Sequence, residues 1–257
     1  ASFAQAPGEQ LIKKLKDAGV VTIPTVGARR HAEKVAEWGV DAVIAQGAEG
    51  GGHTGTVPTS LLLPAVCDAI DIPVIAAGGF QDGRGLVAAL AWGASGVAMG
   101  TRFLLTKEST VPDAIKQIYL ETPVTGTVVT KAIDGHPQRV IRTEVVDQLE
   151  GASRITALPR ALRNALAFRK LTGTSMRALL QEGLAMRKSQ ELSWSQLAMA
   201  ANAPMLTKAA MVDGKAEVGI LPTGQVVGTI DELPTVAELI ERIMAEADAT
   251  LTRLEQQ

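Results

Sequence analysis

Hydrophobic and polar positions alternate along the first hundred residues in short apolar runs and longer amphipathic stretches. The apolar runs, which predict buried strands, lie at residues 1–4, 20–26, 42–45, 73–77 and 96–99. Apolar residues recur at helical spacing between these runs, at residues 10–18, 28–38, 60–70 and 83–92. Glycine follows three of the predicted helices and marks their ends: Gly19, Gly39 and Gly93.

Strands and helices that alternate every 20–25 residues or so are typical of parallel α/β folds. Unusual residues follow four successive predicted strands: Thr25, a glycine-rich loop with a histidine, Gly78-Gly79 and Gly100-Thr101. A (β/α)8 TIM barrel forms its active site from the carboxyl ends of several strands. A doubly wound sheet instead concentrates its ligand site at one switch point. The pattern therefore favours a TIM barrel.

About five strands are predicted, whereas a closed barrel needs eight. After Thr106 the pattern predicts a helix at 112–120, extended segments at 127–130 and 138–143, helical structure at 155–205 and a final amphipathic helix at 233–257. We therefore expect residues 1–125 to form the C-terminal part of a barrel, residues 126–230 a smaller, mainly helical domain, and residues 231–257 a helix that packs back on the barrel. Because an open parallel sheet would leave unpaired edges, we expect about 90 further residues upstream of Ala1.

The loop from Gln46 to Thr56 directly follows a predicted strand and contains five glycines and His53. Glycine is costly in chain entropy, so this density suggests positive φ angles or the close approach of a ligand to the backbone. Histidine side chains exchange protons near neutral pH. The loop is therefore predicted to bind a cofactor and to present His53 as a catalytic base.

Paired small residues after the last two strands indicate a phosphate site. Backbone N–H groups of Gly78 and Gly79 would form one half, and those of Gly100 and Thr101 the other, with the Thr101 hydroxyl as a further donor. The simpler alternative is that both pairs are tight turns. The sequence matches neither a P-loop nor G-x-G-x-x-G.

The remaining histidines and the chain composition narrow the chemistry. His31 and His136 are predicted to be surface residues, so a histidine metal site is not expected. No serine lies in a G-x-S-x-G elbow, which gives a hydrolase triad no support. Met99, Trp92 and Phe103 suit either the core or a cofactor wall, and Gln225, in a glycine-rich segment, could reach back to the site.

Charge and cysteine content exclude other classes. The net charge is −2, from 25 basic and 27 acidic residues, so we expect no nucleic-acid binding. No apolar run approaches the ~20 residues that span a bilayer, so no membrane association is expected. The single cysteine, Cys67, excludes an internal disulfide and favours a cytoplasmic setting. Five basic residues between 154 and 170 are expected on a solvated helical face, or facing the phosphates of a CoA substrate.

The motifs together resemble the nitronate monooxygenase (2-nitropropane dioxygenase) family. The matching segments are Gln46-Gly47-x-Glu49-x-Gly51-Gly52-His53-x-Gly55, Ala76-Ala77-Gly78-Gly79, Met99-Gly100-Thr101-Arg102-Phe103 and Gly224-Gln225. The wider pattern is most similar to an actinobacterial subgroup that acts on CoA thioesters in steroid ring C/D breakdown. The segments that carry this finer resemblance are Glu108–Pro112, Trp194–Gln196 and Gly219–Gly228.

This resemblance implies an FMN-dependent oxidoreductase with a TIM barrel and a smaller helical domain. It implies that His53 is the catalytic histidine, that FMN is contacted by Gln46, Gly51, Gly52 and Gln225, and that the phosphate side is bound by Gly78, Gly79, Met99, Gly100 and Thr101. NADH or NADPH is an expected reductant, an acyl-CoA an expected substrate, and a homo-oligomer is left open.

Three other functions are also compatible with the sequence. The family resemblance also fits a nitronate monooxygenase that oxidises alkyl nitronates with oxygen. The glycine pairs alone would fit a non-redox barrel with a phosphate ligand, although no lysine for a Schiff base stands at a strand end. A non-catalytic fragment is the third, because the pocket wall formed by the earlier βα units is missing from these 257 residues.

Overall fold

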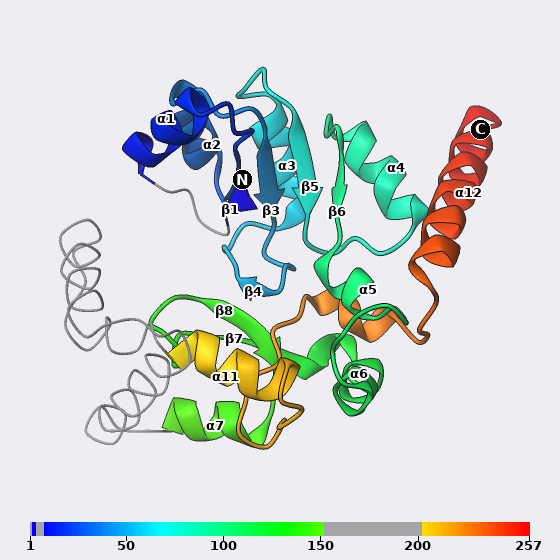
Figure 1. Cartoon of the computed structure of the whole chain (residues 1–257). Helices are drawn as coiled ribbons and strands as arrows, with labels where there is room; N and C mark the ends of the chain where they lie inside the picture. Colours follow the sequence, from blue (N-terminus) through cyan, green and yellow to red (C-terminus); the bar gives the residue numbers. More distant parts are fainter. Residues whose placement is uncertain (1, 4–7, 152–201) are drawn as a thin grey trace. The chain divides into compact units, whose positions relative to one another are not determined.

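The computed structural model describes residues 2–3, 8–151 and 202–257 (Figure 1). The chain forms two compact units. The first unit comprises residues 1–109, 120–125 and 223–257, and the second comprises residues 110–119 and 126–222. The expected boundaries at 125/126 and 230/231 differ from this division, because residues 110–119 join the second unit and residues 223–230 join the first.

The first unit is built on a sheet of five parallel strands in the order β1-β2-β3-β5-β6. Their bounds are Ser2–Phe3, Ile23–Val26, Val43–Gln46, Val74–Ala77 and Gly96–Ala98. All five predicted strands are thus confirmed. Each successive strand of this sheet is added on the same side of the strand before it, so the order of the strands in the sheet follows their order in the chain. This single winding is the arrangement of barrel units and differs from a doubly wound sheet, where the order reverses at a switch point.

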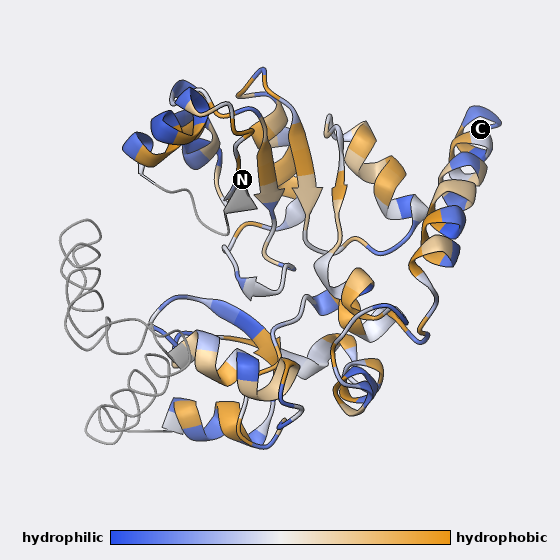
Figure 2. Cartoon of the chain, viewed as in Figure 1, coloured by the Kyte–Doolittle hydropathy of each residue, from blue (hydrophilic) through white to orange (hydrophobic). Residues whose placement is uncertain are grey.

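Four helices connect the strands and cover one face of the sheet. They are α1 (Glu9–Asp17), α2 (Arg29–Glu37), α3 (Thr59–Cys67) and α4 (Gly83–Ala91). Alternate strand residues, such as Val26, Val43 and Ala76, are buried against these helices in one hydrophobic core. Figure 2 shows the hydrophobic colouring of β3 and β5, which the helices cover. Burial of this apolar face stabilises the unit by about 25 cal/mol for each Å² removed from water.

The opposite face of the sheet carries residues that are only half-buried. Thr25, Ile44 and Ile75 lie side by side in register across β2, β3 and β5, and each keeps part of its surface accessible. Gln46 and Thr25 occupy the carboxyl ends of their strands on the same face. This face therefore presents both apolar and polar groups beside the strand ends that carry the predicted chemistry.

A carboxylate joins two strands at the amino end of the sheet. Asp41, just before β3, accepts hydrogen bonds from the Thr22 N–H at 2.7 Å and from the Thr22 hydroxyl at 3.0 Å. Lys16 of α1 contacts the other oxygen of Asp41 at 3.0 Å. The Thr22 N–H, followed by Lys16, lowers the pKa of Asp41 below its usual value of 3.8.

The C-terminal helix α12 (Val236–Glu255) packs against α4 within the first unit. Its buried residues are Leu239, Ile243 and Ala247. The contact is close enough that a Cβ on Gly83 would lie 2.3 Å from the Ile243 carbonyl oxygen. A capping box between Thr235 and Glu238 begins the helix. The predicted final helix at 233–257 is confirmed, with bounds shifted by a few residues.

Three short elements of the first unit have no counterpart in the sequence prediction. They are β4 (Gly52–His53), α5 (Gly100–Leu104) and the 3₁₀ turn η2 (Gln225–Thr229). Each is at most five residues long, too short to produce a hydrophobic period.

The second unit combines helices with an antiparallel strand pair. Strands β7 (Thr127–Thr130) and β8 (Gln138–Ile141) confirm the two predicted extended segments. Helix α6 (Asp113–Leu120) agrees with the predicted helix at 112–120. Helix α11 (Asn202–Met211) overlaps the predicted helical region only at residues 202–205, and α7 (Glu144–Gly151) was not predicted. A 3₁₀ turn, η1 (Val124–Gly126), precedes β7. Most of the predicted helical region 155–205, its basic residues and Trp194–Gln196 lie outside the described residues.

A separate core holds the second unit together. It contains Ile133, Val140, Val146, Leu149 and Ile220. The Tyr119 side chain is fully buried, and its hydroxyl donates to the Pro222 carbonyl at 2.9 Å. Among the described helices of both units, none combines the length and the apolar character needed to cross a bilayer.

Candidate active site

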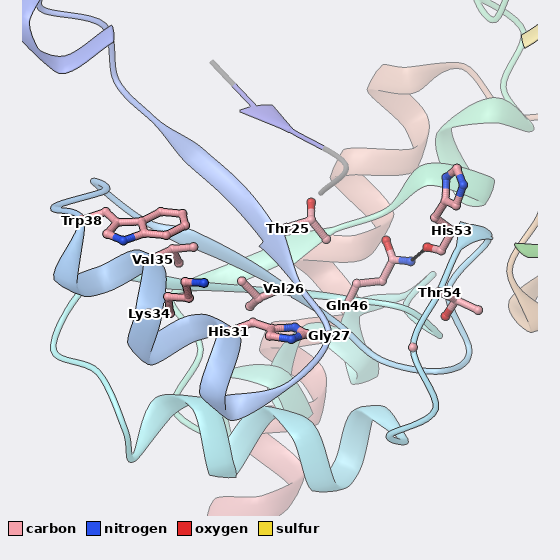
Figure 3. Close-up of a pocket in the computed structure, with 11 residues that line it drawn as sticks. Thr25, Val26, Gly27, His31, Lys34, Val35, Trp38, Gln46, His53 and Thr54 are labelled. Atoms are coloured by element: carbon pink, nitrogen blue, oxygen red, sulfur yellow. Dashed lines mark hydrogen bonds between the residues drawn. The ribbon is translucent and has the colours of Figure 1, made fainter. Parts of the chain in front are cut away.

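The loop after β3 is held by a dense set of hydrogen bonds. The Gln46 side-chain amide donates to the His53 carbonyl oxygen at 2.7 Å, which ties the end of β3 to the histidine (Figure 3). The Ala48 N–H donates to the Val57 carbonyl at 2.8 Å, and the Thr54 hydroxyl contacts the carbonyls of Gly47 and Ala48 at 3.2 and 3.3 Å. The loop is thus a fixed structure that presents His53, and Gln46 takes part in holding it.

The glycines of this loop serve close packing within the protein. A Cβ at Gly47 would lie 2.0 Å from the Thr59 hydroxyl, and one at Gly51 would lie 2.4 Å from the Thr223 backbone. Gly52 adopts a φ of 66° and has open space around it. The sequence interpretation attributed the glycines to positive φ or to a ligand. Packing against Thr59 and Thr223 explains Gly47 and Gly51 instead, while Gly52 keeps open space on its side-chain position.

A cavity of about 420 Å³ lies beside His53 and Gln46. Thr25 and Gly27 from the end of β2, and Thr54 and Gly55 from the histidine loop, also line it. His53 is half-buried and is one of the residues that line this cavity. The structure therefore brings His53, Gln46 and the end of β2 together around one cavity.

Helix α2 contributes a wall that sequence reasoning did not identify. His31, Lys34, Val35 and Trp38 line the cavity, and Figure 3 shows them along the same helix, apart from His53. The Lys34 ammonium lies 5.3 Å from the centre of the Trp38 ring, within the range of a cation–π contact. His31 is exposed, as predicted. The spacing of these residues, i, i+3, i+4 and i+7, is the signal of one helix face, but of the four only His31 was considered, as a surface residue.

The two predicted phosphate-binding pairs follow neighbouring strands. Ala77 of β5 is in register with Ala98 of β6, so Gly78-Gly79 and Gly100-Thr101 leave the sheet side by side. Gly78 and Gly79 have φ angles of 94° and 87°, which favour glycine. Gly79 is exposed, and a Cβ built on it would meet only the side chain of Glu49, at 3.7 Å.

Gly100 begins helix α5 and has an open side-chain position. A Cβ on Gly100 would meet no atom within 4 Å, and the backbone there does not require glycine. The first N–H groups of a helix have no acceptor within the helix, so those of Gly100 and Thr101 can receive an anion. Nothing in the described protein requires glycine at this position, and the open space fits a bound phosphate.

The side chains of Met99 and Thr101 make contacts within the protein. The Met99 side chain is only 8% exposed and packs in the core of the first unit, so only its backbone can contact a ligand. The Thr101 hydroxyl accepts from the Gly224 N–H at 3.0 Å and lies 3.3 Å from the Thr223 hydroxyl. Its oxygen thus holds the segment that contains Gly224, and its predicted role as a donor to phosphate stays a prediction.

Gln225 joins the candidate site through its backbone. Its N–H donates to the Glu49 carbonyl at 3.0 Å, which places the start of η2 against the histidine loop. The same segment contacts Thr101, so residues 223–225 connect the histidine loop with the start of α5. The expectation that this glycine-rich segment returns to the site agrees with these contacts.

Arg102 holds α5 in place through hydrogen bonds of its guanidinium group. Arg102 is 3% exposed, and its guanidinium donates to the carbonyls of Leu105 at 2.8 Å and Glu232 at 3.1 Å. Burial lowers the pKa of this guanidinium, and the nearby Glu232 opposes the shift. Arg102 thereby fixes α5 to the segment that leads into α12.

Among the described residues, no group of three His, Cys, Asp or Glu side chains is arranged to hold a metal ion.

Comparison with known proteins gives the assignment. The sequence model described as nitronate monooxygenase matches residues 1–246 of this chain. The chain belongs to the nitronate monooxygenase family. Its resemblance at the level of motifs is therefore confirmed over almost the whole length, and the chain is an oxidoreductase.

Two relatives in this family share most of the sequence. Both are named "(3aS,4S,5R,7aS)-5-hydroxy-7a-methyl-1-oxo-octahydro-1H-indene-4-carboxyl-CoA dehydrogenase". The protein from Mycobacterium tuberculosis is 59% identical over 250 residues, which cover 96% of this chain and 70% of the relative. The protein from Rhodococcus jostii is 58% identical over 247 residues, with the same coverage of 96% and 70%. A "Probable nitronate monooxygenase" from Staphylococcus aureus is 39% identical over 153 residues, 56% of this chain and 43% of the relative.

Solved structures of the family confirm the TIM-barrel class. FabK from Thermotoga maritima matches with a TM-score of 0.75 and 34% identity, over 99% of this chain and 70% of that one. A nitroalkane oxidase from Streptomyces ansochromogenes matches with a TM-score of 0.70 and 30% identity, over 98% and 65%. The singly wound parallel sheet of the first unit is in accord with these likenesses.

Proposed function

We propose that this member of the nitronate monooxygenase family is an FMN-dependent oxidoreductase that acts on a CoA thioester. The observation that carries the cofactor proposal is the pair of turns after β5 and β6. They expose Gly79 and Gly100 side by side, with open space at Gly100, in the same unit as His53. The observation that supports the substrate is the 59% identity to a dehydrogenase named for a carboxyl-CoA substrate.

The residues present suit the phosphate end of FMN. In the proposed complex, the backbone N–H groups of Gly78, Gly79, Gly100 and Thr101 donate to the phosphate oxygens, aided by the positive end of α5. Met99 contributes only its backbone, because its side chain is buried. The ring end of FMN would lie beside the histidine loop. The residues on or against that loop are Gln46, Gly51, Gly52 and Gln225.

FMN supplies two-electron redox chemistry when it is bound, and the protein supplies position and proton transfer. His53 lies at the cavity and takes or returns a proton at the substrate carbon next to the thioester carbonyl. That carbonyl acidifies the neighbouring C–H bond, so an imidazole base in the cavity matches the task. Gln46 keeps the His53 backbone in place through its 2.7 Å hydrogen bond.

The substrate class follows from the named relatives and from the cavity. A carboxyl-CoA with a fused-ring acyl group has an apolar body and a polar thioester. Trp38 gives the cavity an apolar wall, and Gln46 and His53 give it polar groups, so the cavity provides both kinds of surface. We therefore propose that the enzyme introduces or reduces a double bond conjugated to the thioester, and that NADH or NADPH serves as reductant where reduction is the direction.

A second candidate is oxidation of alkyl nitronates with oxygen. The family description and the 39% identity to a probable nitronate monooxygenase favour it. The same histidine would act on the carbon that bears the nitro group. The two candidates share the cofactor and differ in the substrate.

One anaerobic experiment separates these candidates. The purified protein is examined for flavin absorbance and then mixed without oxygen with NADH, NADPH, ethyl nitronate and a fused-ring carboxyl-CoA. Loss of the oxidised flavin band with the acyl-CoA, or its recovery from reduced enzyme on adding the unsaturated acyl-CoA, supports the first proposal. Bleaching by the nitronate alone supports the second. Protein that binds no flavin on titration with FMN excludes both.

A further inference from the structure

Glu49 lies at the centre of the candidate site although no catalytic or binding role was predicted for it. Its two carboxylate oxygens accept from the Thr59 N–H at 3.2 and 3.0 Å, and one of them accepts from the Thr59 hydroxyl at 2.8 Å. Thr59 is the first residue of α3 and is 5% exposed. The carboxylate therefore takes the place of a capping side chain, which Pro58 at the N-cap does not provide.

The Thr59 hydroxyl connects this carboxylate to the proposed phosphate turn. It also lies 2.9 Å from the Gly78 carbonyl oxygen, in donor geometry. A hydroxyl has one proton, so the Glu49 carboxylate and the Gly78 carbonyl share it. A change at Glu49 or at the Thr59 hydroxyl therefore alters the hydrogen bond to the carbonyl of Gly78, the residue that follows β5.

The rest of Glu49 contacts two further parts of the site. Its carbonyl accepts from the Gln225 N–H at 3.0 Å. Its Cβ and Cγ lie under Gly79, at 3.7 and 4.0 Å from the position of a Cβ there. One residue thus links the histidine loop to α3, to Gly78-Gly79 and to the segment that begins η2.

We propose that Glu49 is a positioning residue that fixes the His53 loop on the Gly78-Gly79 turn. It thereby holds constant the distance between the part of the site that binds the flavin ring and the part that binds the phosphate. The ligand named here rests on the proposed FMN function. The coupling itself rests on the contacts of Glu49 and Thr59. It requires the carboxylate and the Thr59 hydroxyl together, because the carboxylate reaches Gly78 only through that hydroxyl.

The first test uses variants that keep size and change hydrogen bonding. In Glu49→Gln the negative charge is lost and only one oxygen remains to accept both bonds from Thr59, and in Thr59→Val the hydroxyl is lost. We expect each to raise the dissociation constant for FMN at least tenfold. Thr59→Ser keeps the hydroxyl and should bind FMN within about threefold of the wild type.

Asp41→Asn is the matched control. Asp41 accepts from the N–H and hydroxyl of Thr22, the same donor set, but at the amino end of the sheet. A general loss of stability would affect FMN binding in both variants, whereas positioning predicts an effect only in Glu49→Gln. The proposal is overturned if Glu49→Gln binds FMN like the wild type, or if Asp41→Asn weakens binding as much.

An NMR measurement without cofactor tests the coupling independently. The protein has three histidines, so the imidazole signals of His31, His53 and His136 can be assigned by single substitutions. Glu49→Gln and Thr59→Val should shift or broaden the His53 signal and leave the other two in place. An unchanged His53 signal overturns the proposal. If the wild type binds no FMN, the proposed function fails, and this measurement alone decides whether Glu49 positions His53.

Discussion

The two ends of the parallel sheet contain the same small piece of chemistry with different surroundings. At the amino end, Asp41 accepts from the N–H and hydroxyl of Thr22. At the carboxyl end, Glu49 accepts from the N–H and hydroxyl of Thr59. The amino-end pair joins the starts of β2 and β3 and adds one contact to Lys16. The carboxyl-end pair connects to Gly78 and, through the Glu49 backbone, to Gln225.

This difference shows that the position in the fold, more than the bond itself, decides what such a pair does. In TIM barrels the carboxyl ends of the strands form the site and the amino ends contribute stability. The Asp41–Thr22 pair should therefore contribute to the free energy of unfolding and leave ligand binding unaffected. The Glu49–Thr59 pair should act on the geometry of the site as well.

The largest expected effect at the carboxyl end is that of His53→Ala. Removal of the imidazole beside the cavity should lower kcat at least 100-fold, because a positioned acid–base group contributes about that much or more. FMN affinity should stay close to that of the wild type, since the loop is held by Gln46 through the His53 backbone. Steady-state turnover of the acyl-CoA and an FMN titration are the measurements. A variant with full turnover would show that the proton is handled elsewhere.

Two glycine substitutions should separate ligand space from backbone strain. Gly100→Ala adds a methyl group where the protein leaves open space, so FMN should bind at least tenfold more weakly while the free energy of unfolding stays equal or rises slightly. Gly39→Ala, at the amino end, places alanine at a φ of 77° and should cost about 1 kcal/mol without changing FMN affinity.

Urea denaturation and FMN titration of both glycine variants measure stability and FMN affinity for each. The assignment of Gly100 to the phosphate site is contradicted if Gly100→Ala binds FMN normally. The division between the two ends is contradicted if Gly39→Ala weakens binding to the same extent as Gly100→Ala.

Asp41→Asn should lower stability at neutral pH by about 1 kcal/mol, because the acceptor of two hydrogen bonds loses its charge at a partly exposed place. The Thr22 N–H and Lys16 lower the pKa of Asp41 in the folded protein. The stabilisation is therefore complete above the unfolded pKa of 3.8 and is lost as the pH falls through the lower folded value. Urea midpoints at pH 7 and pH 3 should show a gap between variant and wild type that narrows in acid. A gap that stays constant with pH would exclude the charge as its cause.

The strands and helices of the first unit were predictable because each follows a local rule. The strands are continuous apolar runs, and Gly19, Gly39 and Gly93 stand at left-handed positions just after helices, as the sequence suggested. The elements missed in this unit, β4, α5 and η2, are too short for a period. Their formation depends on contacts between distant segments, such as the bond from Gly224 to Thr101.

The candidate site was predicted in its parts more than in its connections. The sequence marked His53, Gly78-Gly79 and Gly100 because glycine and histidine carry distinctive chemistry. It could not show that Gly51 packs on Thr223, or that the Thr101 hydroxyl holds Gly224, because these pairs are more than 100 residues apart. Glu49 was visible in a motif, but its role depends on Thr59 and Gln225, which only the fold brings to it.

The smallest expected effect concerns Lys16→Gln, which divides the amino-end pair into its components. Lys16 and Asp41 lie 3.0 Å apart with both side chains 37% exposed. Water and salt screen such a pair, so its removal should cost less than about 0.5 kcal/mol, and less still in high salt. The two bonds from Thr22 remain in this variant, so most of the loss seen in Asp41→Asn should be absent. If Lys16→Gln instead destabilised the protein as much as Asp41→Asn, the ion pair rather than the threonine bonds would stabilise the amino end, and the two ends would no longer share the same chemistry.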